Sequence, residues 1–140
     1  MLQLIAGSKG TGKTKKIMGL AKVAVAQTSG KVAFIEKGTA LTYDLPHDVR
    51  LFNTDDYEID GADAFYGFLA GIAASDYDMK HIYVDSVVKI VGDNPALVTG
   101  FIDKVDHLAK KQEIEIVMTL SRDASEFPAN ITQFIVTNLT

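Results

Sequence analysis

The sequence predicts an α/β fold, a three-layer sandwich in which helices cover a mostly parallel sheet. Short apolar runs alternate with stretches of helical periodicity along all 140 residues, as in parallel strands joined by crossover helices. The first apolar run leads directly into a glycine-rich segment and then into a helical pattern, which is typical of phosphate-binding units. No linker or repeat interrupts this alternation, so we expect one domain spanning residues 1–140.

Each element follows from its own pattern, in chain order. Apolar runs bounded by turn residues predict strands at residues 2–6, 31–36, 49–52, 81–85 and 113–120, with a sixth at the sheet edge at 134–137. Helical spacing predicts helices at residues 14–28, 62–74 and 94–111. The last helix is expected to start at Asn94-Pro95, because asparagine caps a helix and proline suits its first turn.

The helix expected at residues 62–74 is strongly apolar. A core position explains this better than a membrane or partner-binding face, because a helix packed on a parallel sheet is apolar over much of its circumference. Gly67 and Gly71 allow close packing against either a strand or a second subunit, and the sequence leaves both open.

Residues Gly7, Ser8, Lys9, Gly10, Thr11, Gly12, Lys13 and Thr14 form a complete phosphate-binding loop motif: glycine, four residues, glycine, lysine and threonine. The glycines let successive backbone N–H groups turn toward phosphate oxygens, and the following helix adds its positive end. We expect Lys13 to reach the β and γ phosphates of ATP or GTP, and the Thr14 hydroxyl to complete the Mg²⁺ shell. The alternative is an ordinary glycine turn between a strand and a helix.

Composition excludes several other chemistries. The chain has no cysteine, which rules out disulfides, thiolate metal sites and cysteine nucleophiles. His47, His81 and His107 are too scattered for a zinc site. No apolar run approaches the length of about 18 residues that a membrane span needs, and the first strand leaves no room for a cleavable signal peptide. We therefore expect a cytoplasmic protein without a membrane partner.

The net charge of −4 conceals an asymmetry along the chain. Residues 1–35 hold six lysines and no acid, so the positive field lies where phosphates are expected. The remainder is acidic, most clearly at residues 55–60, and has no basic stripe. Nucleic acid is therefore not an expected partner.

Asp85 is the expected second half of the site. It ends the apolar run at residues 82–85, and in open parallel sheets ligands lie at the carboxyl ends of strands. There the carboxylate would face Mg²⁺. Asp85 is also placed to cap the turn at residues 86–91, and the two roles are compatible.

These segments resemble the RecA-like ATPases, a superfamily of P-loop proteins that includes recombinases. Ile82-Tyr83-Val84-Asp85-Ser86-Val87 is similar to that group's metal-site strand, and residues 32–36 with the turn through Ala40-Leu41 are similar to the second recombinase strand. The resemblance covers residues 1–122. It implies that another strand separates the first strand from the metal-site strand, and that an acidic residue on the neighbouring strand orients the attacking water.

Glu36 is the residue expected in that water-orienting role, because it is the first acid in the chain and ends the second strand. A pairing of Glu36 with Lys37 or a loop lysine is the alternative. In recombinases the catalytic glutamate lies slightly beyond the strand, and the simplest match to it here is Gly38.

Thr119, Ser121 and Arg122 fall where RecA-like proteins keep a polar sensor of the γ-phosphate. Three other roles remain open for Arg122: stacking on a base, pairing with Asp123, or reaching a neighbouring subunit's nucleotide.

Lys9 is a second cation in the loop, and we expect it to be a solvated lysine that raises the local potential. In some dimeric P-loop ATPases an extra lysine, one position earlier in the motif, reaches the partner's phosphates.

The leading hypothesis is an Mg²⁺-dependent ATPase of RecA-like build with slow or partner-stimulated turnover, in which Lys13, Glu36, Asp85 and Arg122 act in catalysis. Residues 86–112 hold a single helix, which leaves no space for DNA-gripping loops. One alternative is a nucleotide-gated regulatory module. Another is a small phosphotransferase such as a nucleoside kinase, although a chain with two arginines lacks the usual lid. A homo-oligomer or protein partner fits the resemblance, and the lack of a guanine-specifying motif favours ATP over GTP.

Overall fold

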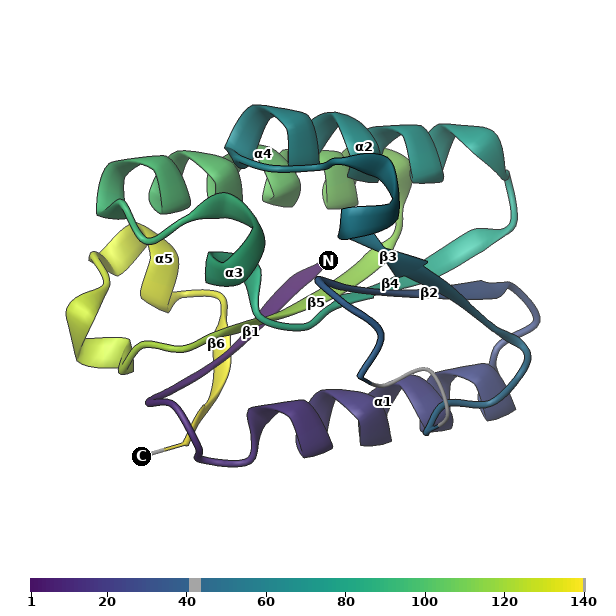
Figure 1. Cartoon of the computed structure of the whole chain (residues 1–140), viewed down its shortest axis with the longest axis horizontal. Helices are drawn as coiled ribbons and strands as arrows, with labels where there is room; N and C mark the ends of the chain where they lie inside the picture. Colours follow the sequence, from purple (N-terminus) through teal and green to yellow (C-terminus); the bar gives the residue numbers. More distant parts are fainter. Residues whose placement is uncertain (41–43, 140) are drawn as a thin grey trace.

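The computed structural model describes residues 1–40 and 44–139 and has an α/β fold (Figure 1). Six strands form one sheet in the order β3-β2-β4-β5-β1-β6, and every neighbouring pair is parallel. Helix α1 lies on one face of this sheet, and α2 and α4 lie on the other (Figure 1). The α/β class, the parallel sheet and the helices on both faces are as the sequence predicts.

The strands are β1 (Leu2–Gly7), β2 (Lys31–Glu36), β3 (Val49–Asn53), β4 (Met79–Val84), β5 (Glu115–Leu120) and β6 (Ile135–Leu139). The α-helices are α1 (Lys13–Gln27), α2 (Ala62–Ser75), α3 (Val87–Val91), α4 (Pro95–Gln112) and α5 (Ala129–Thr132). Two 3₁₀ turns are η1 (Thr54–Tyr57) and η2 (Ala124–Glu126). Leu41, which belongs to the segment compared with the second recombinase strand, lies outside the described residues.

Three strands start at a residue other than the predicted one, and several strand ends differ by one or two residues. β5 starts at Glu115 because Glu113 adopts a left-handed conformation, φ 55°, that closes α4. β6 starts at Ile135 because the Phe134 N–H still donates to the Ile131 carbonyl at 3.0 Å, in the turn after α5. β4 starts at Met79, which pairs with Lys31 of β2.

The strand order bears on the expected site. β5 lies between β1 and β4, so another strand separates the first strand from the strand that precedes Asp85, as expected from the resemblance. β2 is the other neighbour of β4. The carboxyl ends of β1, β5, β4 and β2 therefore follow one another along one edge of the sheet.

Alternate residues of the central strands feed two hydrophobic cores on opposite faces of the sheet. Leu4, Ile82 and Ile116 pack with α2 and α4, including Phe65 and Phe101, whose rings stack at 5.5 Å. The next residue along each of these strands, Ile5, Tyr83 and Val117, packs with α1 on the other face. The predicted core position of the apolar helix α2 is confirmed by its buried residues Phe65, Leu69 and Ile72.

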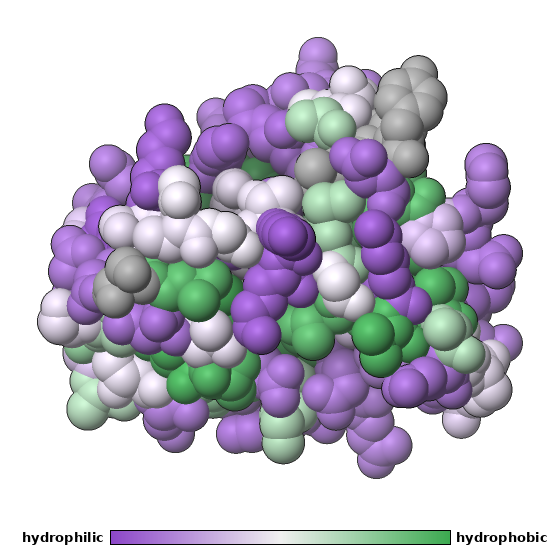
Figure 2. All heavy atoms as spheres, turned by 90° about the horizontal axis from the view of Figure 1, so that it is seen from below, coloured by the Kyte–Doolittle hydropathy of each residue, from purple (hydrophilic) through white to green (hydrophobic). Residues whose placement is uncertain are grey.

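Helix α1 packs its inner side on the sheet and turns its outer side to solvent. Ile17, Ala21 and Ala24 are buried, whereas Lys22 and Val23 are exposed. Seen from the α1 side, this face of the molecule mixes hydrophilic residues with smaller hydrophobic areas (Figure 2). Among the described residues, none of the helices combines the length and apolarity that crossing a bilayer requires.

Gly67 and Gly71 of α2 do not serve close packing within the described chain. A Cβ atom built on either glycine would meet no heavy atom within 4 Å. Of the two readings left open by the sequence, packing against a strand of the same chain is therefore wrong for the described residues.

Candidate functional site

Four segments meet at the carboxyl edge of the sheet. The glycine-rich loop, residues 7–14, follows β1; Asp85 and Ser86 follow β4; Thr119 lies near the end of β5; and Glu36 ends β2. The Asp85 N–H donates to the Ile35 carbonyl at 3.0 Å, which holds Asp85 beside the end of β2. Residues far apart in sequence are thereby brought to one place.

The glycine-rich loop has the backbone conformation that its glycines predict. Gly10 and Gly12 adopt positive φ angles of 82° and 92°, which favour glycine over residues with a Cβ. The loop closes on itself, because the Thr11 hydroxyl donates to the Ser8 carbonyl at 2.7 Å. The Lys13 ammonium donates to the same carbonyl at 2.8 Å, although Lys13 already belongs to α1.

The Lys13 side chain is only 7% exposed. Burial lowers its pKa below the ordinary value of 10.5, and the nearby Asp85 carboxylate acts in the opposite direction. The ammonium is thus held at the loop with little solvation of its own. An anion in the loop would supply the compensation that water does not.

Asp85 links the glycine-rich loop to β5 through its two carboxylate oxygens. Oδ2 accepts from the Thr14 hydroxyl and Oδ1 accepts from the Thr119 hydroxyl, both at 2.9 Å. The Thr119 hydroxyl in turn accepts from the Ser86 N–H at 2.6 Å. Helix α3 has Ser86 at its N-cap and receives no side-chain cap, so capping is not what Asp85 does here.

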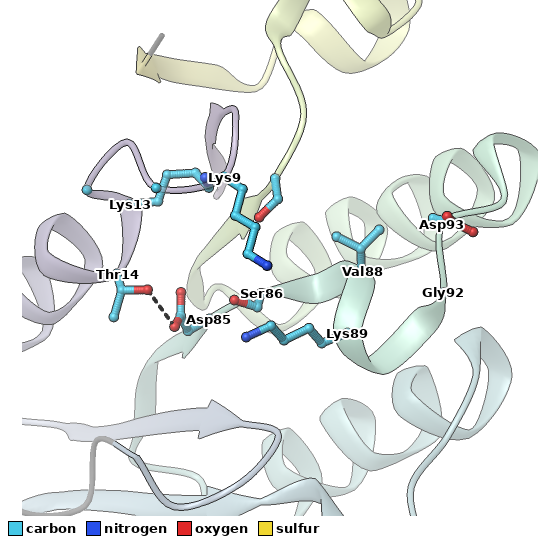
Figure 3. Close-up of a pocket in the computed structure, with 12 residues that line it drawn as sticks. Lys9, Lys13, Thr14, Asp85, Ser86, Val88, Lys89, Gly92 and Asp93 are labelled. Atoms are coloured by element: carbon cyan, nitrogen blue, oxygen red, sulfur yellow. Dashed lines mark hydrogen bonds between the residues drawn. The ribbon is translucent and has the colours of Figure 1, made fainter.

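A pocket of about 650 Å³ lies over these groups (Figure 3). The glycine-rich loop forms one wall with Lys9, Gly10, Gly12, Lys13 and Thr14, and the floor holds Asp85 and Ser86. The opposite wall consists of Val88, Lys89, Gly92 and Asp93, from α3 and the turn after it, and Ser121 also lines the pocket. Its lining combines backbone amides, ammonium groups and a carboxylate, which suits a polyanionic ligand together with a cation.

A smaller cavity of about 160 Å³ joins Glu36 to the same groups. Its lining includes Glu36, Lys37, Thr14, Asp85 and Lys89. Glu36 is therefore placed beside the Thr14 and Asp85 pair, at the end of the strand next to β4, where the sequence puts it. Lys37, the first alternative partner considered for Glu36, pairs with Asp55 instead: its ammonium lies 2.6 Å from the Asp55 carboxylate.

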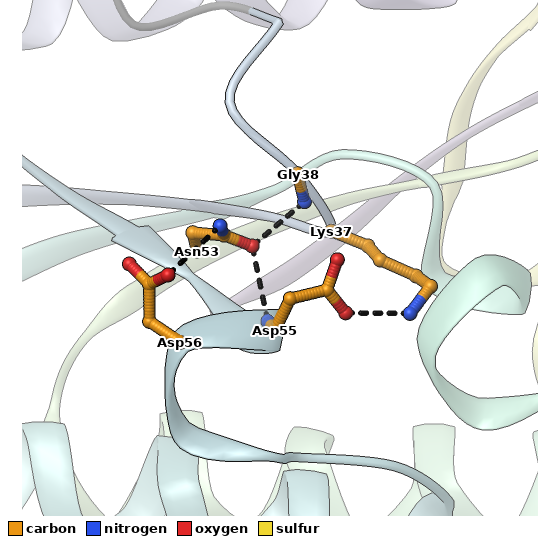
Figure 4. Close-up of polar contacts among 5 residues, drawn as sticks. All are labelled: Lys37, Gly38, Asn53, Asp55 and Asp56. Carbon is orange, nitrogen blue, oxygen red and sulfur yellow. Dashed lines mark hydrogen bonds and ion pairs between the residues drawn. The ribbon is translucent and has the colours of Figure 1, made fainter.

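Besides the ion pair between Lys37 and Asp55, the side chain of Asn53 fastens the segment that follows Glu36 to η1 (Figure 4). The Asn53 Oδ1 atom accepts from the Gly38 N–H at 2.7 Å and from the Asp55 N–H at 3.0 Å. The Asn53 Nδ2 atom donates to Asp56 at 3.3 Å. Gly38 has a φ of 103°, so a glutamate at this position would be strained.

Arg122 lies at the margin of the site. Its guanidinium donates to the Asp93 backbone carbonyl, and its own carbonyl accepts from the Gly7 N–H at 2.8 Å. Arg122 is not among the residues that line the large pocket, whereas Ser121 is. The pairing with Asp123 considered from the sequence is not formed, because the Asp123 carboxylate accepts from the Ser125 N–H at 2.9 Å.

Lys89 is the residue at this site that sequence reasoning missed. It is the only basic residue between Asp85 and Asp93. The helical spacing of Val87, Ile90 and Val91, all buried, was the available signal that residue 89 faces away from the core. Among residues 1–40 and 44–139, no three His, Cys, Asp or Glu side chains are grouped as a metal site.

Neither a scan against protein-family models nor a search of curated proteins gives a match for this chain.

Proposed function

We propose that this chain binds a nucleoside triphosphate, ATP in the first instance, together with Mg²⁺ in the 650 Å³ pocket, and hydrolyses it slowly or in response to a partner. One observation supports this most. A buried carboxylate, Asp85, accepts the hydroxyl of Thr14 at 2.9 Å across 71 residues of sequence, directly beside a glycine-rich loop that holds a buried lysine. This juxtaposition is what binding of a metal and a phosphate chain requires.

The residues present fit a phosphate chain. Gly10 and Gly12 carry no side chain that would block the backbone amides, and Lys13 offers a poorly solvated ammonium. Lys13 is only 7% exposed, and because burial of a charge costs free energy, a phosphate chain in the loop would add favourable compensation to its hydrogen bond with the Ser8 carbonyl.

The residues also fit Mg²⁺. Thr14 and Asp85 offer a hydroxyl and a carboxylate oxygen side by side, and Mg²⁺ accepts such a small protein contribution because phosphates and water complete its octahedral shell. When bound, the metal would neutralise charge on the β and γ phosphates. Thr119 would hold Asp85 in place through its 2.9 Å hydrogen bond.

Glu36 is the side chain best placed to orient water for hydrolysis, because it lines the cavity that also contains Thr14 and Asp85. In this reaction the water oxygen bonds to the terminal phosphorus, and the bond from that phosphorus to the bridging oxygen breaks. The electron pair stays on the diphosphate, and one water proton passes to Glu36 and then to solvent.

The proposal is tested by calorimetry with Mg-ATP and Mg-GTP, followed by a phosphate-release assay. Wild type should bind and release phosphate, whereas Lys13→Ala should lose most of the affinity. Lys22→Ala removes the same charge from the exposed side of α1 and serves as the control. Absence of binding by folded wild type at millimolar nucleotide would refute the proposal.

A regulatory module that binds nucleotide without efficient hydrolysis is a second candidate, favoured by the conformation of Gly38. With φ at 103° and its N–H held by Asn53, position 38 supplies no carboxylate. The two candidates differ in the behaviour of Glu36→Gln. If Glu36 orients water, this variant binds like wild type but hydrolyses more slowly, whereas in a regulatory module neither property changes.

A further inference from the structure

The short helix α3 presents Lys89 to the site from a fixed position. Val87, Ile90 and Val91 are buried in the core and Val88 is partly buried against it, whereas Lys89 is exposed and lines the pocket that the glycine-rich loop also lines. The helix is held at both ends: at its N-cap the Ser86 N–H donates to the Thr119 hydroxyl at 2.6 Å, and near its other end the Ile90 carbonyl accepts from the Gly61 N–H at 2.9 Å. The flexible side chain of Lys89 thus starts from a rigid backbone.

Lys89 borders both cavities that meet at Asp85. It lines the 650 Å³ pocket opposite Lys13, and it also lines the 160 Å³ cavity that contains Glu36. In Figure 3 its ammonium points toward Asp85 and Ser86. Lys89 therefore borders both the pocket that would hold the phosphates and the cavity of the carboxylate that would orient water.

Within the part of the chain that the structure describes, Lys89 is the only basic residue that lines both of these cavities. The Lys37 ammonium pairs with Asp55, and the Arg122 guanidinium donates to the Asp93 carbonyl. Lys9 lines the large pocket but not the cavity with Glu36. Among the described residues, the Lys89 ammonium has no carboxylate within 4.0 Å, so it is available to an anion.

We propose that Lys89 contacts the terminal phosphoryl group of the bound triphosphate and stabilises the charge that develops on it during hydrolysis. This inference rests on the proposed function and deepens it. As the bond to the bridging oxygen breaks, negative charge builds up on that oxygen and is spread over the phosphoryl oxygens, and many nucleotide hydrolases receive a compensating cation from a partner. Here Lys89 would supply a cation of this kind from within the chain.

The test compares Lys89→Ala, Lys89→Arg and wild type, with Lys22→Ala as a control of equal charge change on exposed α1. Two affinities are measured by calorimetry: that for a nonhydrolysable ATP analogue, and that for ADP with aluminium fluoride, which resembles the transition state. Phosphate release gives kcat. We expect Lys89→Ala to lower kcat and the affinity for ADP with aluminium fluoride by about 100-fold each, and the affinity for the ATP analogue by less than about threefold. Lys89→Arg should restore part of both losses, because it restores the charge.

The outcomes separate this inference from the proposed function. If wild type binds no nucleotide, both fail. If wild type binds nucleotide and Lys89→Ala either equals wild type or weakens both ligands to the same extent, only the role of Lys89 is overturned, because the residue then contributes nothing specific to the transition state. The aluminium fluoride complex gives this answer even if turnover is too slow to follow.

Discussion

Asp85 shows how a single residue joins elements that are distant in sequence. Its carboxylate is 7% exposed, and a charge in such a place is tolerated only when hydrogen bonds replace the lost water. The hydroxyls of Thr14 and Thr119 provide these bonds from α1 and β5. Asp85 and the two threonine side chains that stabilise its charge are thus the ones that would position a metal ion.

Replacing Asp85 by asparagine should separate metal binding from folding. Asparagine keeps the shape and can still hydrogen-bond both threonines, but it removes the negative charge. We expect Asp85→Asn to fold and to lose the Mg²⁺ enhancement of nucleotide affinity by about 10- to 100-fold. Calorimetry with Mg²⁺ and with EDTA measures this. The control is Asp93→Asn, which changes a carboxylate in the wall of the same pocket and should leave the Mg²⁺ enhancement of nucleotide affinity intact. If Asp85→Asn retains that enhancement, Asp85 does not bind the metal.

The lowered pKa of Lys13 predicts that nucleotide binding takes up protons at alkaline pH. In the free protein, burial lowers the pKa of Lys13 below 10.5. A bound phosphate would favour the charged ammonium and therefore raise the pKa of Lys13. The bound form therefore holds more protons, and affinity should fall as pH rises through the free-state value. Calorimetry in buffers of different ionisation enthalpy measures the proton uptake. Lys13→Met should abolish this uptake, and a pH-independent affinity in wild type would show that Lys13 does not contact the phosphates.

At the residue scale, sequence reasoning worked where a residue type has one dominant use. The motif predicted a tight glycine loop, which forms with positive φ at Gly10 and Gly12, and Thr14 and Asp85, both expected at one metal site, lie within hydrogen-bond distance of each other. Lys89 was not predicted, because an isolated lysine in a short apolar turn reads as a solvated surface residue. Its proposed role depends on its lining one cavity together with Glu36, which no local sequence pattern encodes.

Among the elements, β6 and the glycine-rich loop depend on each other through Gly7. A Cβ atom at Gly7 would lie 2.0 Å from the Leu139 carbonyl oxygen, so only glycine lets the end of β6 approach β1 here. The sequence explains Gly7 by the phosphate motif alone. The structure gives it a second role, which arises because β6 pairs with β1 at the sheet edge and sequence reasoning could not assign that pairing in detail.

Gly7→Ala should therefore destabilise the protein even without nucleotide. We expect a loss of about 1–3 kcal/mol in the free energy of unfolding, because β6 must shift to admit the methyl group. Gly19→Ala is the matched control, since Gly19 lies on α1, no heavy atom of the described residues comes within 4 Å of the added Cβ, and the change should stabilise by about 0.5–1 kcal/mol. Urea unfolding measures both. Equal shifts in the same direction would mean that the β6 contact does not constrain Gly7.

For the molecule as a whole, the central strands make two cores interdependent. Successive residues such as Leu4 and Ile5 belong to opposite cores, so loss of packing on one face removes the support of the same backbone on the other. The alternation of strands and helices predicted this layered architecture. The order of the strands in the sheet depends on long-range pairing, such as that of β1 with β5 across more than a hundred residues. From the sequence, only the resemblance to RecA-like ATPases indicated a part of this order.

Because the cores share strands, a cavity in either one should lower the stability of the entire sheet in a single transition. Phe101→Ala acts on the α4 side and should cost about 3–5 kcal/mol, while Ile17→Ala acts on the α1 side and should cost about 2–5 kcal/mol. Val23→Ala, on the exposed side of α1 at 53% exposure, should change stability by less than about 0.5 kcal/mol. Urea unfolding followed by circular dichroism and by tyrosine fluorescence should give one midpoint per variant. Two separated midpoints in either core variant would mean that the faces of the sheet unfold independently and that the strands do not transmit the loss of packing.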